Sequence, residues 1–83
     1  MKPFEIESVI QEALEVTHVE VRNPQQDGLH FEALVVSPIF EGKSLIEQHQ
    51  LVMNSLKSHF ESALHALSLK TLTPQEWNEK KHG

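Results

Sequence analysis

The side chains that could do chemistry in this sequence are its histidines, because the chain contains six histidines and no cysteine. Without a thiol it cannot form a disulfide, a cysteine zinc site or a cysteine nucleophile. A thiolate ligand for any metal must therefore come from a partner. Two of the histidines, His30 and His65, are candidate metal ligands. On spacing alone, however, His65 is more simply explained as a hydrogen-bonded residue at the edge of the core, and His30 as a residue at a loop end.

Motifs of the common enzyme classes are absent from the sequence. No G-x-S-x-G, H-E-x-x-H, phosphate-binding P-loop or G-x-G-x-x-G occurs. The single aspartate, Asp27, has no second carboxylate patterned with it for acid–base catalysis. The sequence therefore predicts a protein that is not an enzyme.

Length and composition predict one folded domain over residues 1–83. With 39% hydrophobic and 23% charged residues, the chain has the composition of a globular protein and not of a disordered one. A chain this short buries only about 60 to 65% of its unfolded surface, so its core is thin. The longest apolar run, residues 33–36, is far below the ~20 residues of a membrane span, and the first residues lack a signal-peptide core. We therefore expect a cytoplasmic location.

Hydrophobic periodicity predicts a helix and two strands in the first half of the chain. Apolar residues recur at helical spacing over residues 4–14, with glutamates on the other face, which is typical of an amphipathic helix. Residues 18–22 alternate and predict a short strand, which the turn formers of residues 23–28 end. Residues 29–37 predict a second strand, antiparallel to the first because the link is short.

The second half predicts a long helix, a strand and a final helix. Ser44 and Glu47 have the spacing of a capping box, and an apolar face continues this helix to the region of His59, where a break would split it in two. Residues 64–72 alternate as a third strand, and residues 73–76 read T-P-Q-E, a well-specified helix start. The face of the long helix expected to be buried consists of Leu45, His49, Val52, Leu56 and Phe60.

This order places the chain in the α/β (α+β) class, as helix, strand, strand, helix, helix, strand and helix. A helix between the second and third strands is a crossover connection, which lays these strands parallel in a shared sheet. We therefore expect a small mixed sheet of three strands with helices packed on one face.

Three motifs resemble the BolA family, and the match extends over almost the whole chain. Residues 40–45 read F-x-G-K-S-L, residues 65–70 read H-A-L-S-x-K, and residues 73–77 read T-P-x-E-W. The segment D-G-L-H-F at residues 27–31 and the lack of cysteine resemble the IbaG or YrbA branch in particular. The resemblance implies a fold similar to the second class of KH domains, in agreement with the element order above.

The resemblance also implies a function. Many members of the family bind monothiol glutaredoxins and bridge a two-iron, two-sulfur cluster, and the founding members are also described as transcriptional regulators. In the resemblance, the family's invariant histidine falls on His65. The family's variable loop ligand, a cysteine or a histidine, falls on His30. These two histidines are the metal ligands that the resemblance implies, and it implies no catalytic residue.

Two histidines can hold one iron of such a cluster, as Rieske centres show. If His30 and His65 serve one iron, a glutaredoxin cysteine and a glutathione thiol must serve the other. The cluster is then expected only when it is shared with glutaredoxin, and not in the isolated chain. An imidazole must be neutral to coordinate, so we expect cluster sharing to weaken as the pH falls toward the ordinary histidine pKa of roughly 6.5.

The alternative function is nucleic-acid binding in transcriptional regulation, suggested by the KH-like fold and by the family. KH domains grip the backbone with a G-x-x-G loop, which the sequence lacks. Many relatives carry arginines beside the helix histidine, whereas this chain has glutamines on both sides of His49. The formal net charge of −5 with a single arginine, Arg22, also argues against strong nonspecific binding to phosphates.

Other conspicuous side chains are expected to have structural or surface roles. His49 is expected to form a structural hydrogen bond on its helix. Trp77 is expected to pack the last helix against the sheet. Surface positions are expected for His18, His59 and His82, and a charged tail for Lys80 and Lys81.

Overall fold

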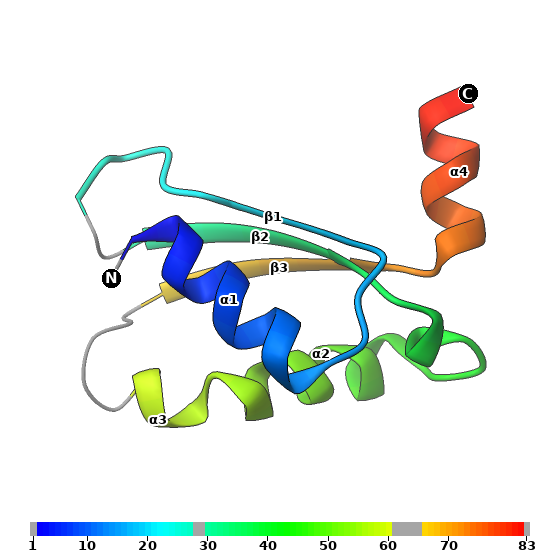
Figure 1. The fold of residues 1–83 in the computed structure, drawn as a ribbon, viewed down its shortest axis with the longest axis horizontal. Helices are drawn as coiled ribbons and strands as arrows, with labels where there is room; N and C mark the ends of the chain where they lie inside the picture. Colours follow the sequence, from blue (N-terminus) through cyan, green and yellow to red (C-terminus); the bar gives the residue numbers. More distant parts are fainter. Residues whose placement is uncertain (1, 28–29, 61–65, 83) are drawn as a thin grey trace.

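The elements of the chain follow the order predicted from the sequence. The computed structural model describes residues 2–27, 30–60 and 66–82 (Figure 1). A short 3-10 turn, η1, is the one addition to the predicted order. The elements are α1 (Pro3–Ala13), β1 (His18–Arg22), β2 (His30–Val36), η1 (Pro38–Phe40), α2 (Leu45–Ser55), α3 (Lys57–Phe60), β3 (Ala66–Leu72) and α4 (Pro74–His82).

The three strands form one mixed sheet in the order β1, β2, β3. β1 runs antiparallel to β2, and β2 runs parallel to β3, so the predicted fold class is confirmed. The predicted strands 29–37 and 64–72 correspond to β2 and β3, and β2 ends at Val36, one residue earlier than predicted. Residues 29, 64 and 65 lie outside the part of the chain that the structure describes.

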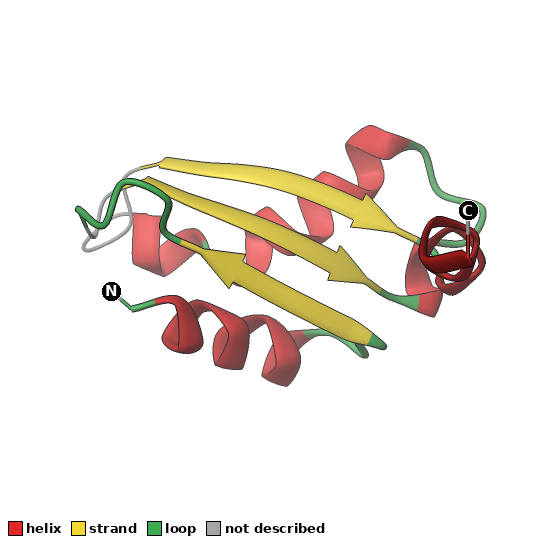
Figure 2. Cartoon of the chain, turned by 90° about the horizontal axis from the view of Figure 1, so that it is seen from above, coloured by secondary structure: helices red, strands yellow, loops and turns green. Residues whose placement is uncertain are grey.

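The hydrophobic core lies between the sheet and the helices α1, α2 and α3, which cover one face (Figures 1 and 2). Ile6 and Ile10 of α1 and Val35 of β2 are fully buried there. Because strand side chains alternate between the two faces, Glu32 and Leu34 of β2 point to the opposite face. The predicted placement of helices on one face is therefore confirmed for these three helices.

Helix α4 is the exception to this placement. It stands at the end of β3 on the other side of the sheet from α2, and Figure 2 shows it end-on. Residues 74–82 carry mostly charged and polar side chains around Trp77 and lack the apolar stripe that core packing needs. Trp77 instead stacks on the ring of His18, with centroids 4.6 Å apart and planes 16° from parallel. His18, expected on the surface, is half-buried.

Helix α2 begins at the predicted capping box. The Ser44 hydroxyl accepts from the Glu47 N–H at 3.2 Å, and the Ser44 N–H donates to the Glu47 carboxylate at 2.8 Å. The bond from the Ser44 N–H to the carboxylate first, and then a hydrogen bond of the Ser44 side chain with the same carboxylate, hold the pKa of Glu47 below its ordinary value of 4.5. The helix ends at Ser55, earlier than the expected break near His59. None of the described helices is long and apolar enough to cross a membrane.

A buried amide connects α2 to the turn before it and to β3. Gln48 Nε2 donates to the carbonyls of Phe40 and Lys43 at 3.2 and 3.0 Å, and its Oε1 accepts from the Thr71 hydroxyl at 2.6 Å. Gln48 is 9% exposed, whereas Leu45, expected in the core, is 62% exposed. The expectation for Leu45 is wrong because a glutamine with all its hydrogen bonds satisfied can occupy the buried face.

The rest of the predicted face of α2 is largely confirmed. Val52 and Leu56 are fully buried, and His49 is half-buried. The side chain of Phe60 lies outside the described part.

Candidate metal centre

His30 is the first residue of β2, and Asp27 fixes its side chain. The Asp27 carboxylate accepts from the backbone N–H of His30 at 3.0 Å, and its second oxygen lies 2.6 Å from the ring Nδ1. One carboxylate thus holds both the backbone and the ring of the same residue. The His30 side chain remains 51% exposed, so a docking molecule can reach the ring.

The contact with Asp27 decides which ring nitrogen can bind a metal. A neutral imidazole carries one N–H and one lone pair, and the carboxylate acceptor requires the N–H at Nδ1. The lone pair is then on Nε2. Carboxylates hold metal-binding histidines in this way, fixing the tautomer and making the ligand more basic. His30 therefore has the local chemistry of a metal ligand through Nε2.

Strand β3 begins opposite His30. In the parallel register His30 pairs with Ala66, and Figure 1 shows the two strands starting at the same end of the sheet. His65 precedes Ala66 in the sequence and lies outside the described residues. The structure therefore places one of the two predicted ligands, His30, and the role of His65 stays a prediction.

Asp27 is the residue of this site whose role the sequence reasoning missed. The local signal for a carboxylate behind a histidine is the spacing D-x-x-H over residues 27–30. Within residues 2–27, 30–60 and 66–82, no group of three or more histidine, cysteine, aspartate or glutamate side chains is placed to hold a metal ion. In that part of the chain, the site consists of His30 with Asp27 behind it.

Comparison with known proteins places the chain among its relatives. A family model described as BolA-like protein matches residues 10–76. The chain belongs to the BolA family. Acid stress protein IbaG of Escherichia coli K12 is 36% identical over 78 residues, which cover 93% of this chain and 89% of that protein. BolA-like protein 2 of Homo sapiens is 41% identical over 70 residues, or 82% of this chain and 80% of that protein.

Solved structures of BolA proteins have the same fold. The BolA domain of SufE1 from Arabidopsis thaliana superposes with a TM-score of 0.80 at 32% identity, covering 89% of this chain and 93% of that domain. The region matched by the BolA family model includes Asp27, His30 and His65 and ends before Lys80. The candidate metal ligands therefore lie inside the matched region, whereas most of α4 lies beyond it.

The other described histidines have surroundings unlike those of His30. His18 Nε2 lies 3.2 Å from Glu20 Oε1, within ion-pair distance but outside hydrogen-bond geometry, and its ring is covered by Trp77. His59 is half-buried in α3. Among the histidines within the described ranges, His30 thus combines an exposed ring with a carboxylate on Nδ1.

Proposed function

We propose that this BolA-family protein is a non-enzymatic adaptor that binds a monothiol glutaredoxin and shares a two-iron, two-sulfur cluster with it. His30 and His65 hold one iron, and a glutaredoxin cysteine and a glutathione thiol hold the other. The observation that carries the proposal is the contact of Asp27 with His30 Nδ1 at 2.6 Å, because it assigns the lone pair of a half-exposed ring to Nε2.

The residues of this chain have two tasks in the proposed function. Asp27 fixes the tautomer and the direction of the His30 ring before any partner arrives, which lowers the entropy cost of forming the site. The register that pairs His30 with Ala66 brings His30 beside the residue that follows His65 in the sequence. When bound, the cluster supplies iron atoms that accept both imidazole and thiolate ligands. A chain without cysteine takes its thiolates from the partner.

The names of two relatives are consistent with this function. SufE-like protein 1 of Arabidopsis thaliana matches 92% of this chain over 21% of its own length, and we take a BolA domain joined to a SufE-like protein as support for an iron–sulfur role. The Escherichia coli relative is named an acid stress protein. Histidine ligation makes a cluster acid-sensitive, since protons compete with iron for the imidazole.

The test is a titration of the purified chain with a holo-glutaredoxin, followed by visible circular dichroism and by native mass. We expect a one-to-one complex with a visible spectrum that differs from that of the holo-glutaredoxin alone. His30→Ala and His65→Ala should each abolish this difference, because an iron that loses one imidazole is left with an incomplete ligand set. The matched control is His49→Gln, which removes a histidine from α2 and should leave the spectrum unchanged.

Two results would contradict the proposal. If the complex forms with an unaltered spectrum in both His30→Ala and His65→Ala, the histidines are not the ligands. If no complex forms with the unmodified chain, glutaredoxin is not the partner.

A further inference from the structure

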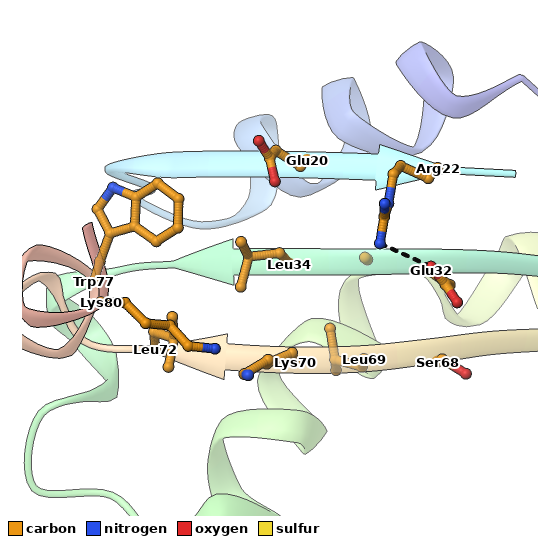
Figure 3. A pocket seen from close by; sticks show the side chains of 11 residues that line it. Glu20, Arg22, Glu32, Leu34, Ser68, Leu69, Lys70, Leu72, Trp77 and Lys80 are labelled. Atoms are coloured by element: carbon orange, nitrogen blue, oxygen red, sulfur yellow. Dashed lines mark hydrogen bonds and ion pairs between the residues drawn. The ribbon is translucent and has the colours of Figure 1, made fainter. Parts of the chain in front are cut away.

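A hollow lies on the open face of the sheet, opposite α1 and α2. It is lined by residues of all three strands and of α4, and its volume is about 330 Å³. This is near the lower end of the range for small-molecule sites. Figure 3 shows strand side chains along its floor, with Trp77 and Lys80 of α4 at one end.

One of the two carboxylates that line the hollow is paired with a cation. Glu32 Oε1 accepts from Arg22 Nη2 at 3.1 Å, the dashed contact in Figure 3. Glu20 Oε1 lies 3.2 Å from His18 Nε2. The charge of Glu32 is therefore compensated by Arg22 and not by the lysines, whereas the neighbour of Glu20 is an imidazole that is charged only when protonated.

Lys70 of β3 and Lys80 of α4 meet at the end of the hollow nearest α4 (Figure 3). Their contact lowers the pKa of Lys80, because a hydrogen bond with Lys70 and the repulsion between the two charges both disfavour the protonated form. Among the described residues, no carboxylate lies within 4.0 Å of either ammonium group. The chain as a whole has a net charge of −5, but these two cations are held together. An anion bound between them would relieve their mutual repulsion.

Apolar side chains line the same end of the hollow. Leu34, Leu72 and Trp77 contribute to its wall, and the Trp77 ring is held by its stack on His18. Because this wall is fixed by contacts within the protein, it is formed before any ligand binds. The hollow thus combines two adjacent ammonium groups with a preformed apolar surface.

We propose that this hollow binds a small organic anion, a carboxylate or a phosphate monoester carried on a short apolar body. Lys70 and Lys80 hold the anionic group, and Leu34, Leu72 and Trp77 contact the apolar body. Lys80 lies beyond the region matched by the BolA family model, and the site is separate from His30 at the start of β2. This inference does not depend on the proposed role in cluster sharing.

Trp77 is the only tryptophan, so its fluorescence reports on the hollow directly. The unmodified chain is titrated with hexanoate, with hexyl phosphate and with acetate, at constant ionic strength maintained with sodium chloride. We expect a saturable change with at least one of the two six-carbon anions, and binding of acetate weaker by about tenfold or more because acetate lacks the apolar body. The tighter of the two six-carbon anions identifies the head group.

Charge variants test the role of the lysines. Lys70→Gln and Lys80→Gln should each weaken binding of the preferred anion by about five- to tenfold, since each removes one charge contact. Lys57→Gln removes the same charge from α3, on the other face of the sheet, and should change binding by less than about twofold. Amide shifts of β3 and the Trp77 indole N–H shift give a second readout that is independent of fluorescence.

Three results would overturn the inference. Neither six-carbon anion produces a saturable change, acetate binds as tightly as hexanoate, or Lys57→Gln weakens binding as much as Lys80→Gln. The last result would mean that only the overall charge matters.

Discussion

The two ends of the sheet carry sites that are built in different ways. At the start of β2, His30 is held by Asp27, which lies three positions earlier in the sequence. At the other end, Trp77 of the last helix stacks on His18 of the first strand, and Lys80 of α4 meets Lys70 of β3. The first arrangement is local in sequence, and the second requires α4 to dock.

One small sheet thus presents two kinds of chemistry. The end at His30 offers a nitrogen lone pair, which suits a transition metal, and the end at α4 offers positive charge beside apolar surface, which suits an organic anion. Each end depends on its own contacts. Perturbing one end should therefore leave the other almost unchanged.

A fall in pH should produce the largest difference between the ligand binding of the two ends. Between pH 8 and pH 5.5 we expect the visible circular dichroism of the complex with glutaredoxin to be lost, because imidazoles gain protons as the pH falls, and the proton displaces iron. The site at the other end needs no imidazole lone pair, so binding of hexanoate or hexyl phosphate should persist. Holo-glutaredoxin alone, taken through the same titration, is the control. A spectrum of the complex that stays constant over this range counts against histidine ligation.

Asp27→Asn should have the next largest effect, confined to the end at His30. If the asparagine carbonyl accepts from the His30 backbone N–H, its NH₂ group faces Nδ1 and moves the ring proton to Nε2, which blocks the lone pair. Loss of such a partner typically weakens metal affinity about 10- to 100-fold. The measurement is the concentration of glutaredoxin at half-formation of the complex. Asp27→Asn binding as tightly as the unmodified chain would show that the carboxylate does not orient the ligand.

Gln48→Leu should destabilise the fold that both ends share. The substitution leaves the Lys43 carbonyl and the Thr71 hydroxyl without their partner, while the Phe40 carbonyl still accepts from the Lys43 N–H at 3.1 Å. An unsatisfied buried group costs about 1–3 kcal/mol. We expect the free energy of unfolding in urea to fall by about 2 kcal/mol. Gln50→Leu, an exposed position on the same helix, is the control. Equal stability of the Gln48 and Gln50 variants would mean that the buried amide is not structural.

Trp77→Ala should damage only the end at α4. The ring stack with His18 is worth about 1 kcal/mol beyond the area it buries, so we expect a similar loss of stability and loss of anion binding, monitored by amide shifts. The visible spectrum of the complex with glutaredoxin should not change. Loss of that spectrum in a folded Trp77→Ala protein would show that the two ends are coupled.

Glu47→Gln should have the smallest effect, since Glu47 is exposed and belongs to neither end. The pKa of its carboxyl is lowered in the folded chain, so its contribution to stability is fully present above its ordinary value of 4.5 and is lost as the pH falls through the lower folded value. The stability difference between the variant and the unmodified chain should therefore shrink below pH 4.5. A difference that stays constant between pH 7 and pH 3 would exclude the charged capping bond.

Local signals explain which parts of the fold could be predicted from the sequence. Apolar periodicity and the Ser44 capping box predicted the order of the elements and the start of α2. The same periodicity placed Leu45 in the core, because it counts every glutamine as polar. It does not reveal that Gln48 forms hydrogen bonds with three residues outside its own helix, Phe40, Lys43 and Thr71. The position of α4 could not be predicted either, since its contacts with His18 of β1 and Lys70 of β3 are not apparent from the local sequence.

The two sites also differ in how far they could be predicted from the sequence. The family motif predicted His30, and the D-x-x-H spacing is a local signal that would have revealed Asp27. The hollow has no such signal, because Lys70 and Lys80 meet only when α4 folds back over the end of the sheet. From the sequence, Lys80 and Lys81 were therefore interpreted as a charged tail.

The most direct test of the central claim is the detection of histidine nitrogen bound to iron. The chain is labelled with ¹⁵N-histidine, mixed with unlabelled holo-glutaredoxin and glutathione, and reduced for pulsed electron paramagnetic resonance. We predict hyperfine couplings from two ¹⁵N nuclei, one of which disappears in His30→Ala and the other in His65→Ala where residual complex can be trapped. A reduced cluster in the complex that shows no ¹⁵N coupling would contradict the account.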